Sequence, residues 1–127
     1  MTSTNTSPRG IILFAHGSRD PLWRLPMEAV ALRVKQLDAK ATVACAFLEL
    51  TEPSLPTCAA DMIKAGVQSF TIVPMFLGVG KHAREDLPLL IADLKASHPS
   101  ITVTLQPAIG EDARVLDLLA HIAASKT

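Results

Sequence analysis

The stretch from Gly10 to Asp20 reads GIILFAHGSRD, and it decides the fold class. Its first half contains Ile11–Ala15, an unbroken apolar run that is typical of a strand buried on both faces of a parallel sheet. Its second half is polar and begins with His16, so polar side chains follow directly where the strand ends. We therefore expect a buried strand that delivers reactive groups to one edge of a sheet.

Three more segments complete the predicted sheet. Thr42–Leu48 and Phe70–Leu77 are also nearly continuous in apolar character, so they too suit buried strands. Ile101–Leu105 alternates apolar residues with threonine, which favours an edge strand with one wetter face. The longer stretches between these runs indicate a sheet built by crossover connections.

The stretches between the strands show helical periodicity, with apolar residues at steps of three and four. The four stripes are Met27, Val30, Val34 and Leu37; Cys58, Ala59, Met62 and Ile63; Leu87, Leu90, Ile91 and Leu94; and Val115, Leu118, Leu119 and Ile122. Acidic residues close to proline predict where the first three helices begin, at Asp20-Pro21, Glu52-Pro53 and Asp86-Leu87-Pro88. Pro26 predicts a late or irregular start for the first helix.

A strand followed by a helix, four times over, predicts one doubly wound α/β domain. Connections of this length indicate right-handed crossovers, a parallel sheet and helices on both faces. For the four strands we expect the flavodoxin-like order 2-1-3-4. A length of 127 residues suits a single domain. We assign residues 10–127 to that domain and expect residues 1–9, which are mostly polar, to form a flexible N-terminal tail.

The composition disfavours several classes of protein. Twelve Lys and Arg residues balance twelve Asp and Glu residues, so no net positive field draws the chain to nucleic acid or to a membrane surface. Aromatic residues make up 4% and include no tyrosine, which leaves little for base stacking. The first residues do not resemble a signal peptide, no apolar run reaches membrane length, and Cys45 and Cys58 lack a redox or disulfide-framework spacing. We therefore expect a reduced, cytoplasmic protein.

Reactive residues follow the first three predicted strands. His16 comes after the first, Glu49 after the second, and His82 in the segment after the third. Ligands bind at the carboxyl ends of parallel strands, and strands 2, 1 and 3 are predicted neighbours, so these three side chains are expected to share one edge. Two imidazoles and one carboxylate can form a site for a divalent transition metal, and the same groups can accept protons.

Each of these residues also has a plainer interpretation. A single histidine after a strand is usually a loop residue, and only the expected meeting of His16 and His82 at one edge strengthens the case for function. Glu49 could simply cap the second helix, and Glu52 could take its place at the edge.

Glycines and cations surround the two histidines. Gly17, Gly78 and Gly80 leave room where a large flat ligand could approach the backbone, and they permit positive φ. Positive charge gathers nearby in a chain without net charge, at Arg19, Arg24, Lys81 and Arg84. Such a cluster suits a ligand that carries carboxylates or phosphates.

A nucleotide is not indicated. Gly80-Lys81 is similar to the end of a P-loop motif. That motif requires glycine at position 75 and serine or threonine at position 82, but these positions are Met75 and His82. The glycine pattern of dinucleotide-binding domains does not follow the first strand either. The sequence therefore predicts neither ATP use nor an organic cofactor.

The residues at the strand ends resemble those of a known family. The matching segments are His16-Gly17-Ser18-Arg19, Phe47–Leu50 with Pro53-Ser54-Leu55, Val73–Leu77, Gly80-Lys81-His82 and Asp86-Leu87-Pro88. In this order, and over residues 10–124, the chain is similar to the small sirohydrochlorin cobaltochelatases and ferrochelatases of the CbiX type. The resemblance implies a chelatase-like fold and ATP-independent insertion of a divalent metal into the tetrapyrrole sirohydrochlorin, in cobalamin or sirohaem biosynthesis.

The resemblance also implies roles for single residues. His16 and His82 match the family's metal-binding and proton-accepting histidines, and Glu49 matches an acidic residue of the same cavity. The residues then expected to bind the tetrapyrrole are Ser18, Arg19, Gly78, Gly80, Lys81 and Arg84. The metal substrate would be Co²⁺, Fe²⁺ or Ni²⁺. Larger relatives contain two such domains in tandem, which implies a homodimer for a chain of this length.

Two other interpretations stay open. The chain could be a carrier of metal or tetrapyrrole with the same fold, which would bind its ligand without accelerating insertion. It could also be a degenerate, structural half of a larger complex, against which the intact set of His16, Glu49 and His82 argues.

Overall fold

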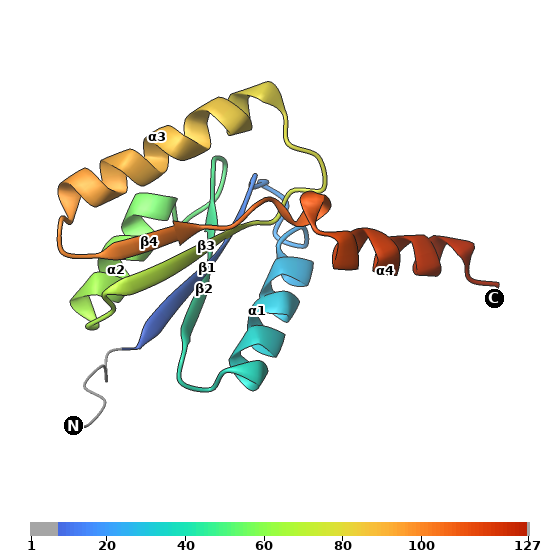
Figure 1. Ribbon diagram of the computed structural model, residues 1–127, viewed down its shortest axis with the longest axis horizontal. Coiled ribbons are helices and arrows are strands. Elements are labelled where there is room, and N and C mark those ends of the chain that lie inside the picture. Colours follow the sequence, from blue (N-terminus) through green and yellow to red (C-terminus); the bar gives the residue numbers. More distant parts are fainter. Residues whose placement is uncertain (1–7, 127) are drawn as a thin grey trace.

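A four-stranded parallel sheet forms the centre of the molecule (Figure 1). The computed structural model describes residues 8–126, so residues 1–7 of the predicted tail and Thr127 lie outside the described residues. The strand order β2-β1-β3-β4 confirms the prediction. The strands are β1 Arg9–Ala15, β2 Thr42–Phe47, β3 Ser69–Pro74 and β4 Thr102–Leu105. Strand β1 therefore includes Arg9, the last residue of the predicted tail.

Four helices and one 3₁₀ turn connect and flank these strands, which confirms the α/β class. They are α1 Leu25–Leu37, α2 Leu55–Lys64, α3 Lys81–Ser97, η1 Ile109–Glu111 and α4 Ala113–Ala124. Within residues 8–126, none of the helices combines the length and the apolar character needed to cross a membrane.

The two faces of the sheet carry separate hydrophobic clusters. Successive strand residues point to opposite faces, so Ile12 and Phe14 of β1 pack with residues of α2 and α3. Ile11 and Leu13 point the other way and pack with residues of α1. Strand β4 behaves as the predicted edge strand, because Val103 is buried while the threonines on either side of it are exposed.

Parallel register brings the ends of three strands to one side of the sheet. Ala15 pairs with Phe47, and Phe14 pairs with Pro74, so β1, β2 and β3 end at nearly the same level. We call the segments that follow them the carboxyl edge; it comprises residues 16–20, 48–53 and 75–82. This is the edge at which the sequence predicts the reactive residues.

Helix α1 begins late, as predicted, with Pro26 in its first turn. Met27, Val30 and Val34 pack against the sheet. Leu37 completes the predicted stripe, but it is 89% exposed. The prediction fails there because Leu37 is the last residue of the helix and lies beside the largely exposed connection to β2.

Helix α3 begins at Lys81, so the start predicted at Asp86-Leu87-Pro88 is wrong and Pro88 lies inside the helix. A proline in a helix interior costs about 3 kcal/mol, because it removes one hydrogen bond and crowds the preceding turn. Buried side chains lie on both sides of this proline: Ala83, Leu87, Ile91 and Leu94. Their burial keeps the helix continuous, so His82 belongs to its first turn and not to a loop.

The other two acidic–proline pairs precede their helices and do not start them. Pro21 lies in a turn before α1, and α2 begins at Leu55, after Pro53. The start of α2 is set by Ser54, whose hydroxyl oxygen accepts a hydrogen bond from the Thr57 N–H at 3.3 Å. Ser54, and not Glu49, therefore caps α2.

Helix α4 projects away from the rest of the molecule (Figure 1). The predicted apolar stripe is present, but no residue of α4 is buried. Leu118, Leu119 and Ile122 are 61%, 41% and 62% exposed. The adjacent turn η1 supplies the main contacts of the helix. Within the described chain, the apolar face of α4 thus lacks a covering surface.

Candidate functional site

His16 follows β1 directly and is the first residue of the carboxyl edge. Its side chain is exposed, and its ring lies against the buried ring of Phe76, with centroids 4.4 Å apart and planes inclined by 35°. Phe76 comes from the segment after the neighbouring strand β3. Because a buried aromatic ring restricts the orientations open to the imidazole, His16 is positioned as well as accessible.

The backbone of Glu49 is hydrogen-bonded to the backbone of His16. The Glu49 N–H donates to the His16 carbonyl at 2.9 Å, and the Leu48 N–H donates to the Ala15 carbonyl at 2.8 Å. These bonds continue the pairing of β1 and β2 past the ends of both strands. The side chains of Glu49 and Glu52 are both exposed. The structure thus brings two of the three predicted metal ligands to adjacent backbone positions.

Two glycines let the loops of this edge lie close to neighbouring backbone. Gly17 has a φ of +104°, and a Cβ at this position would overlap the carbonyl oxygen of Glu49. Gly110, in η1, is its counterpart, since a Cβ there would overlap the carbonyl oxygen of Leu77. One glycine therefore accommodates the loop after β2 and the other accommodates the loop after β3. The sequence alone indicates no role for Gly110, because the segment that it meets lies far away along the chain.

Gly78 and Gly80 differ from Gly17. Neither has a positive φ, so neither uses the conformational freedom that glycine permits. Gly80 is the N-cap residue of α3 with a φ of −69°, which any residue can adopt. A Cβ at either position would meet no atom within 4 Å. Their contact with a ligand stays a prediction.

His82 and Lys81 occupy the first turn of α3, and both side chains are exposed. The N-terminus of a helix carries partial positive charge, which favours anions. Arg84 lies one turn further on and is also exposed, and its Nη1 donates to the Val79 carbonyl at 3.5 Å. The first turn of α3 thus carries Lys81 and no acidic residue, which suits a ligand with carboxylates, while Glu85 and Asp86 follow in the second turn.

Ser18 and Arg19 lie in the loop between β1 and α1. The Ser18 hydroxyl oxygen accepts a hydrogen bond from the Asp20 N–H at 3.0 Å, and the Asp20 carboxylate accepts one from the Leu22 N–H at 2.9 Å. Both bonds shape the turn that leads into α1, which gives Ser18 a structural contact that the sequence does not predict. Arg19 is exposed. The binding roles of Ser18 and Arg19 stay predictions.

Arg24 holds the loop that carries Glu49. Its Nη1 donates to the Glu52 carbonyl at 3.3 Å, and its Nε lies 3.0 Å from the Glu28 carboxylate. Its guanidinium carbon is 4.9 Å from the centroid of the Phe47 ring, a cation–π contact. Arg24 therefore ties the start of α1 to the loop after β2. The sequence places it only among the cations around the histidines.

The predicted metal ligands do not form a ready-made cluster. Among residues 8–126, no group of three His, Cys, Asp or Glu side chains is placed to hold a metal ion. His16 and Glu49 are backbone neighbours, whereas His82 lies in the first turn of α3. The assignment of these three residues to the metal stays a prediction that rests on the order of the strands.

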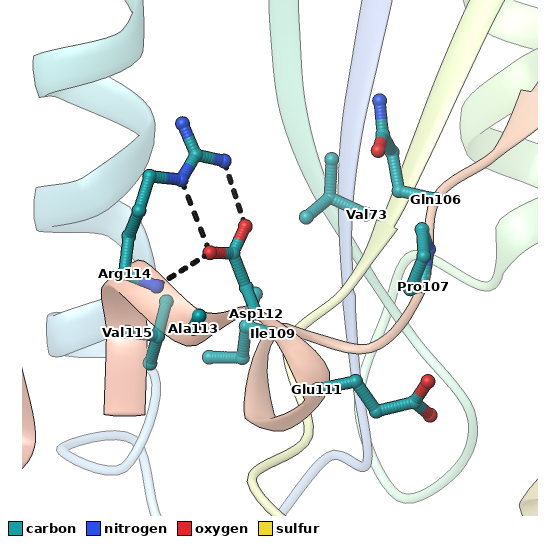
Figure 2. A pocket seen from close by; sticks show the side chains of 9 residues that line it. All are labelled: Val73, Gln106, Pro107, Ile109, Glu111, Asp112, Ala113, Arg114 and Val115. Carbon is teal, nitrogen blue, oxygen red and sulfur yellow. Dashed lines mark hydrogen bonds and ion pairs between the residues drawn. The ribbon is translucent and has the colours of Figure 1, made fainter. Parts of the chain in front are cut away.

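A cavity of about 560 Å³ lies between the end of β3, the segment after β4 and the start of α4 (Figure 2). Its lining includes Val73, which packs with the α1-side cluster, but none of the predicted site residues. Figure 2 shows the Arg114 guanidinium on the Asp112 carboxylate, with Nη2–Oδ2 and Nε–Oδ1 distances of 2.7 and 3.0 Å. These hydrogen bonds lower the pKa of Asp112 to about 2. The cavity is therefore the gap beside α4 and not part of the carboxyl edge.

The two cysteines are buried and do not form a disulfide with each other, which agrees with the absence of a disulfide-framework spacing in the sequence. Burial is the main cause that raises the pKa of the Cys58 thiol to about 11, and burial also raises the pKa of Cys45. Such thiols are protonated at neutral pH and are weak nucleophiles and metal ligands. The chemistry of this protein therefore does not rest on its cysteines.

Comparison with known proteins shows what the chain is similar to. The family model of CbiX matches residues 10–125. The sirohydrochlorin cobaltochelatase of Methanopyrus kandleri is 33% identical over 81 residues, which make up 64% of this chain and 57% of that protein. The matched segment thus spans less than two thirds of that relative's length.

Two solved structures share the fold over most of the chain. A protein named CbiX, of cobalamin (vitamin B12) biosynthesis, from Marinobacter aquaeolei VT8 has a TM-score of 0.80 and 37% identity, covering 91% of this chain and 94% of that one. The sirohydrochlorin chelatase SirB from Bacillus subtilis subspecies spizizenii, in complex with cobalt, has a TM-score of 0.76 and 29% identity. The alignment with SirB covers 90% of this chain but 49% of that one, so this chain corresponds to about half of SirB.

Proposed function

The chain belongs to the CbiX family, and from this premise we propose that it inserts a divalent metal ion into sirohydrochlorin. The observation that carries the proposal is the adjacency of His16 and Glu49 at the carboxyl edge, in a chain that matches the family over residues 10–125. An imidazole and a carboxylate side by side can bind a metal ion and take up protons at one place. The solved SirB structure that shares this fold contains cobalt.

Insertion requires that the metal ion lose water, that pyrrole N–H protons leave, and that the ring nitrogens take the ion. In our proposal His16 and His82 hold the partly dehydrated ion, and Glu49 or a histidine receives the protons. Imidazole binds metal only when it is neutral, so the rate of metal insertion is expected to decrease at acid pH. Cobalt, iron and nickel ions all suit nitrogen and oxygen donors, and their availability helps to decide among them.

The substrate is a tetrapyrrole that carries eight carboxylates. Arg19 and Lys81 of the carboxyl edge, together with Arg84 of α3, are exposed cations that orient the ring through these groups. Ser18, Gly78 and Gly80 lie on the same loops and complete the proposed binding surface. In this proposal the reaction uses neither a nucleotide nor an organic cofactor.

The working assembly in our proposal is a homodimer. Two observations support it: the chain corresponds to about half of SirB, and α4 presents an apolar face that residues 8–126 leave open. A helix with an apolar face of this kind normally packs against another surface, and a second copy of the chain provides one. We place the protein in the cytoplasm, because a reducing compartment suits its two unpaired thiols.

The test is an insertion assay with metal-free sirohydrochlorin and Co²⁺, Fe²⁺ or Ni²⁺ in turn, followed by absorbance under anaerobic conditions. The wild-type chain is expected to accelerate insertion, and His82→Ala is expected to abolish it while far-UV circular dichroism shows an intact fold. His98→Ala is the matched control, because His98 lies at the C-terminal end of α3, at the opposite end of that helix from His82. That variant is expected to insert metal at the wild-type rate.

Two results would contradict this proposal. Near-normal insertion by folded His82→Ala would remove His82 from the mechanism. A wild-type chain that binds the metal or the ring without accelerating insertion would be a carrier and not an enzyme.

A further inference from the structure

Leu50, in the loop after β2, has a backbone conformation that leucine rarely adopts. Its φ is +68°, and it is the one non-glycine residue with a positive φ in the part of the chain that the structure describes. The Thr51 N–H donates to the Glu49 carbonyl at 2.9 Å, which closes a three-residue γ-turn around Leu50. The positive-φ form of this turn is rare and strained for a residue with a Cβ, whereas glycine adopts it freely.

The surrounding structure holds this turn on both sides. Before it, the Glu49 N–H is bonded to the His16 carbonyl at 2.9 Å, and the missing Cβ of Gly17 leaves room for the Glu49 carbonyl. After it, Arg24 donates to the Glu52 carbonyl at 3.3 Å. Strained conformations persist only where their neighbours enforce them, and they concentrate at functional sites.

Packing within the chain does not explain why a leucine stands here. Its side chain is 51% exposed and belongs to neither hydrophobic cluster of residues 8–126. Leu77, in the loop after β3, is similarly 63% exposed. Because β2 and β3 lie on either side of β1, the loop on each side of His16 carries an exposed leucine.

We propose that Leu50 is a substrate-contact residue that packs against the flat face of the tetrapyrrole ring. This inference rests on the proposed function. The carboxylates of sirohydrochlorin lie around the periphery of the ring, where cations can bind them, while the face of the ring is largely apolar and calls for an aliphatic partner. A ring bound beside His16 covers Leu50 and removes its apolar surface from water. Contact with the ring then explains why position 50 is a leucine, which neither its backbone conformation nor its burial explains.

Three substitutions separate the side chain from the backbone. Leu50→Gly removes both the side chain and the strain. Leu50→Asn introduces a polar side chain that tolerates positive φ, and Leu50→Met keeps an apolar side chain. The measurements are the Kd of metal-free sirohydrochlorin by absorbance titration, the KM values for the ring and for Co²⁺, and the Tm. Leu89→Asn is the matched control, because Leu89 is 64% exposed on α3, outside the carboxyl edge.

Leu50→Gly and Leu50→Asn are expected to unfold at the wild-type Tm or above it, yet to bind the ring about tenfold more weakly, as the loss of one large aliphatic contact predicts. The KM for Co²⁺ stays unchanged, Leu50→Met binds the ring within about twofold of wild type, and Leu89→Asn binds it like wild type.

Wild-type ring affinity in the Gly and Asn variants overturns this inference and leaves the proposed function standing. Weakened self-association with unchanged ring affinity, measured by sedimentation, also overturns it and assigns Leu50 to an interface. A wild-type chain that binds no ring contradicts the proposed function itself, and the inference with it.

Discussion

The two faces of the sheet are completed in different ways. On one face, α2 and α3 bury apolar residues of their own, and the strand residues Ile12 and Ile72 beneath them are 0% exposed. On the other face, α1 contains no buried residue, and α4, which projects away from the sheet, contains none either. The first face is covered by helices that bury side chains of their own, whereas α1 and α4 keep exposed apolar residues such as Leu32 and Leu118. We therefore expect substitutions under α2 and α3 to act mainly on folding stability, and substitutions in α4 to act mainly on the proposed assembly.

The largest expected difference between the faces is in the free energy of unfolding. Phe70→Ala empties a position that is 1% exposed on the α2 and α3 face, and it is expected to cost about 3–5 kcal/mol. Val30→Ala removes less volume from a half-buried position of α1, and about 1 kcal/mol is expected. Urea unfolding monitored by circular dichroism measures both values. Similar losses for the two variants would show that the faces contribute equally.

A smaller effect on folding, but a large one on assembly, is expected at α4. Leu119→Lys places a charge on the open apolar face, and it is expected to raise the Kd of the homodimer about tenfold or more. The free energy of unfolding of the single chain should change by less than about 0.5 kcal/mol. Sedimentation velocity measures the association. The matched control is Leu89→Lys on the outer side of α3, where the same charge should leave the dimer intact. Equal weakening by both variants, or a wild-type chain that stays monomeric, would contradict the proposed role of α4.

The smallest expected effect is a change with pH in the stability of the first turn of α4, compared with the first turn of α2. Side-chain hydrogen bonds from Arg114 lower the pKa of Asp112 from 3.8 to about 2. Because the folded pKa lies below the unfolded one, the contribution of Asp112 to the start of α4 is present above about pH 4 and is lost as the pH falls toward 2. Ser54 caps α2 and does not titrate, so the first turn of α2 should keep its structure over this range.

Amide protection factors from NMR, measured between pH 4 and pH 2, report on both helix starts. Asp112→Asn keeps a capping oxygen without the charge and should abolish the acid response of α4. A common loss of protection in the first turns of α2 and α4 would show that acid acts on the whole fold and not on this carboxylate.

Local patterns in the sequence predict the sheet well and the helix starts less well. Continuous apolar runs such as Ile11–Ala15 mark buried strands, and their alternation with helices predicts right-handed crossovers and a parallel sheet whose strand ends share one edge. The start of α3 is different, because the local signal at Pro88 opposes a helix that continues through it. The burial of Ala83 and Leu87 outweighs that signal, and this burial exists only once the sheet has formed.

The candidate site, too, is predicted in part by the sequence and decided in part by tertiary contacts. The position of His16 and Glu49 at one edge follows from topology alone, as does the place of His82 after the third strand. The γ-turn at Leu50 and the roles of Arg24 and Gly110 do not follow from it. Arg24 and Gly110 contact backbone groups that are distant in sequence, and the turn at Leu50 is held in place by its surroundings. Local residue spacing does not predict contacts of this kind.

The sequence by itself determined the α/β class, the order of the strands, the edge that carries the reactive residues, and the resemblance to the CbiX family. Only the tertiary structure decided where α3 begins, how the loops beside His16 are held, and that the apolar stripe of α4 is left uncovered by the part of the chain that the structure describes. The physical reason is that periodicity reports that one face of a helix avoids water, but it does not report which surface covers that face. For three helices the chain supplies that surface itself, at least in part, and for α4 it does not.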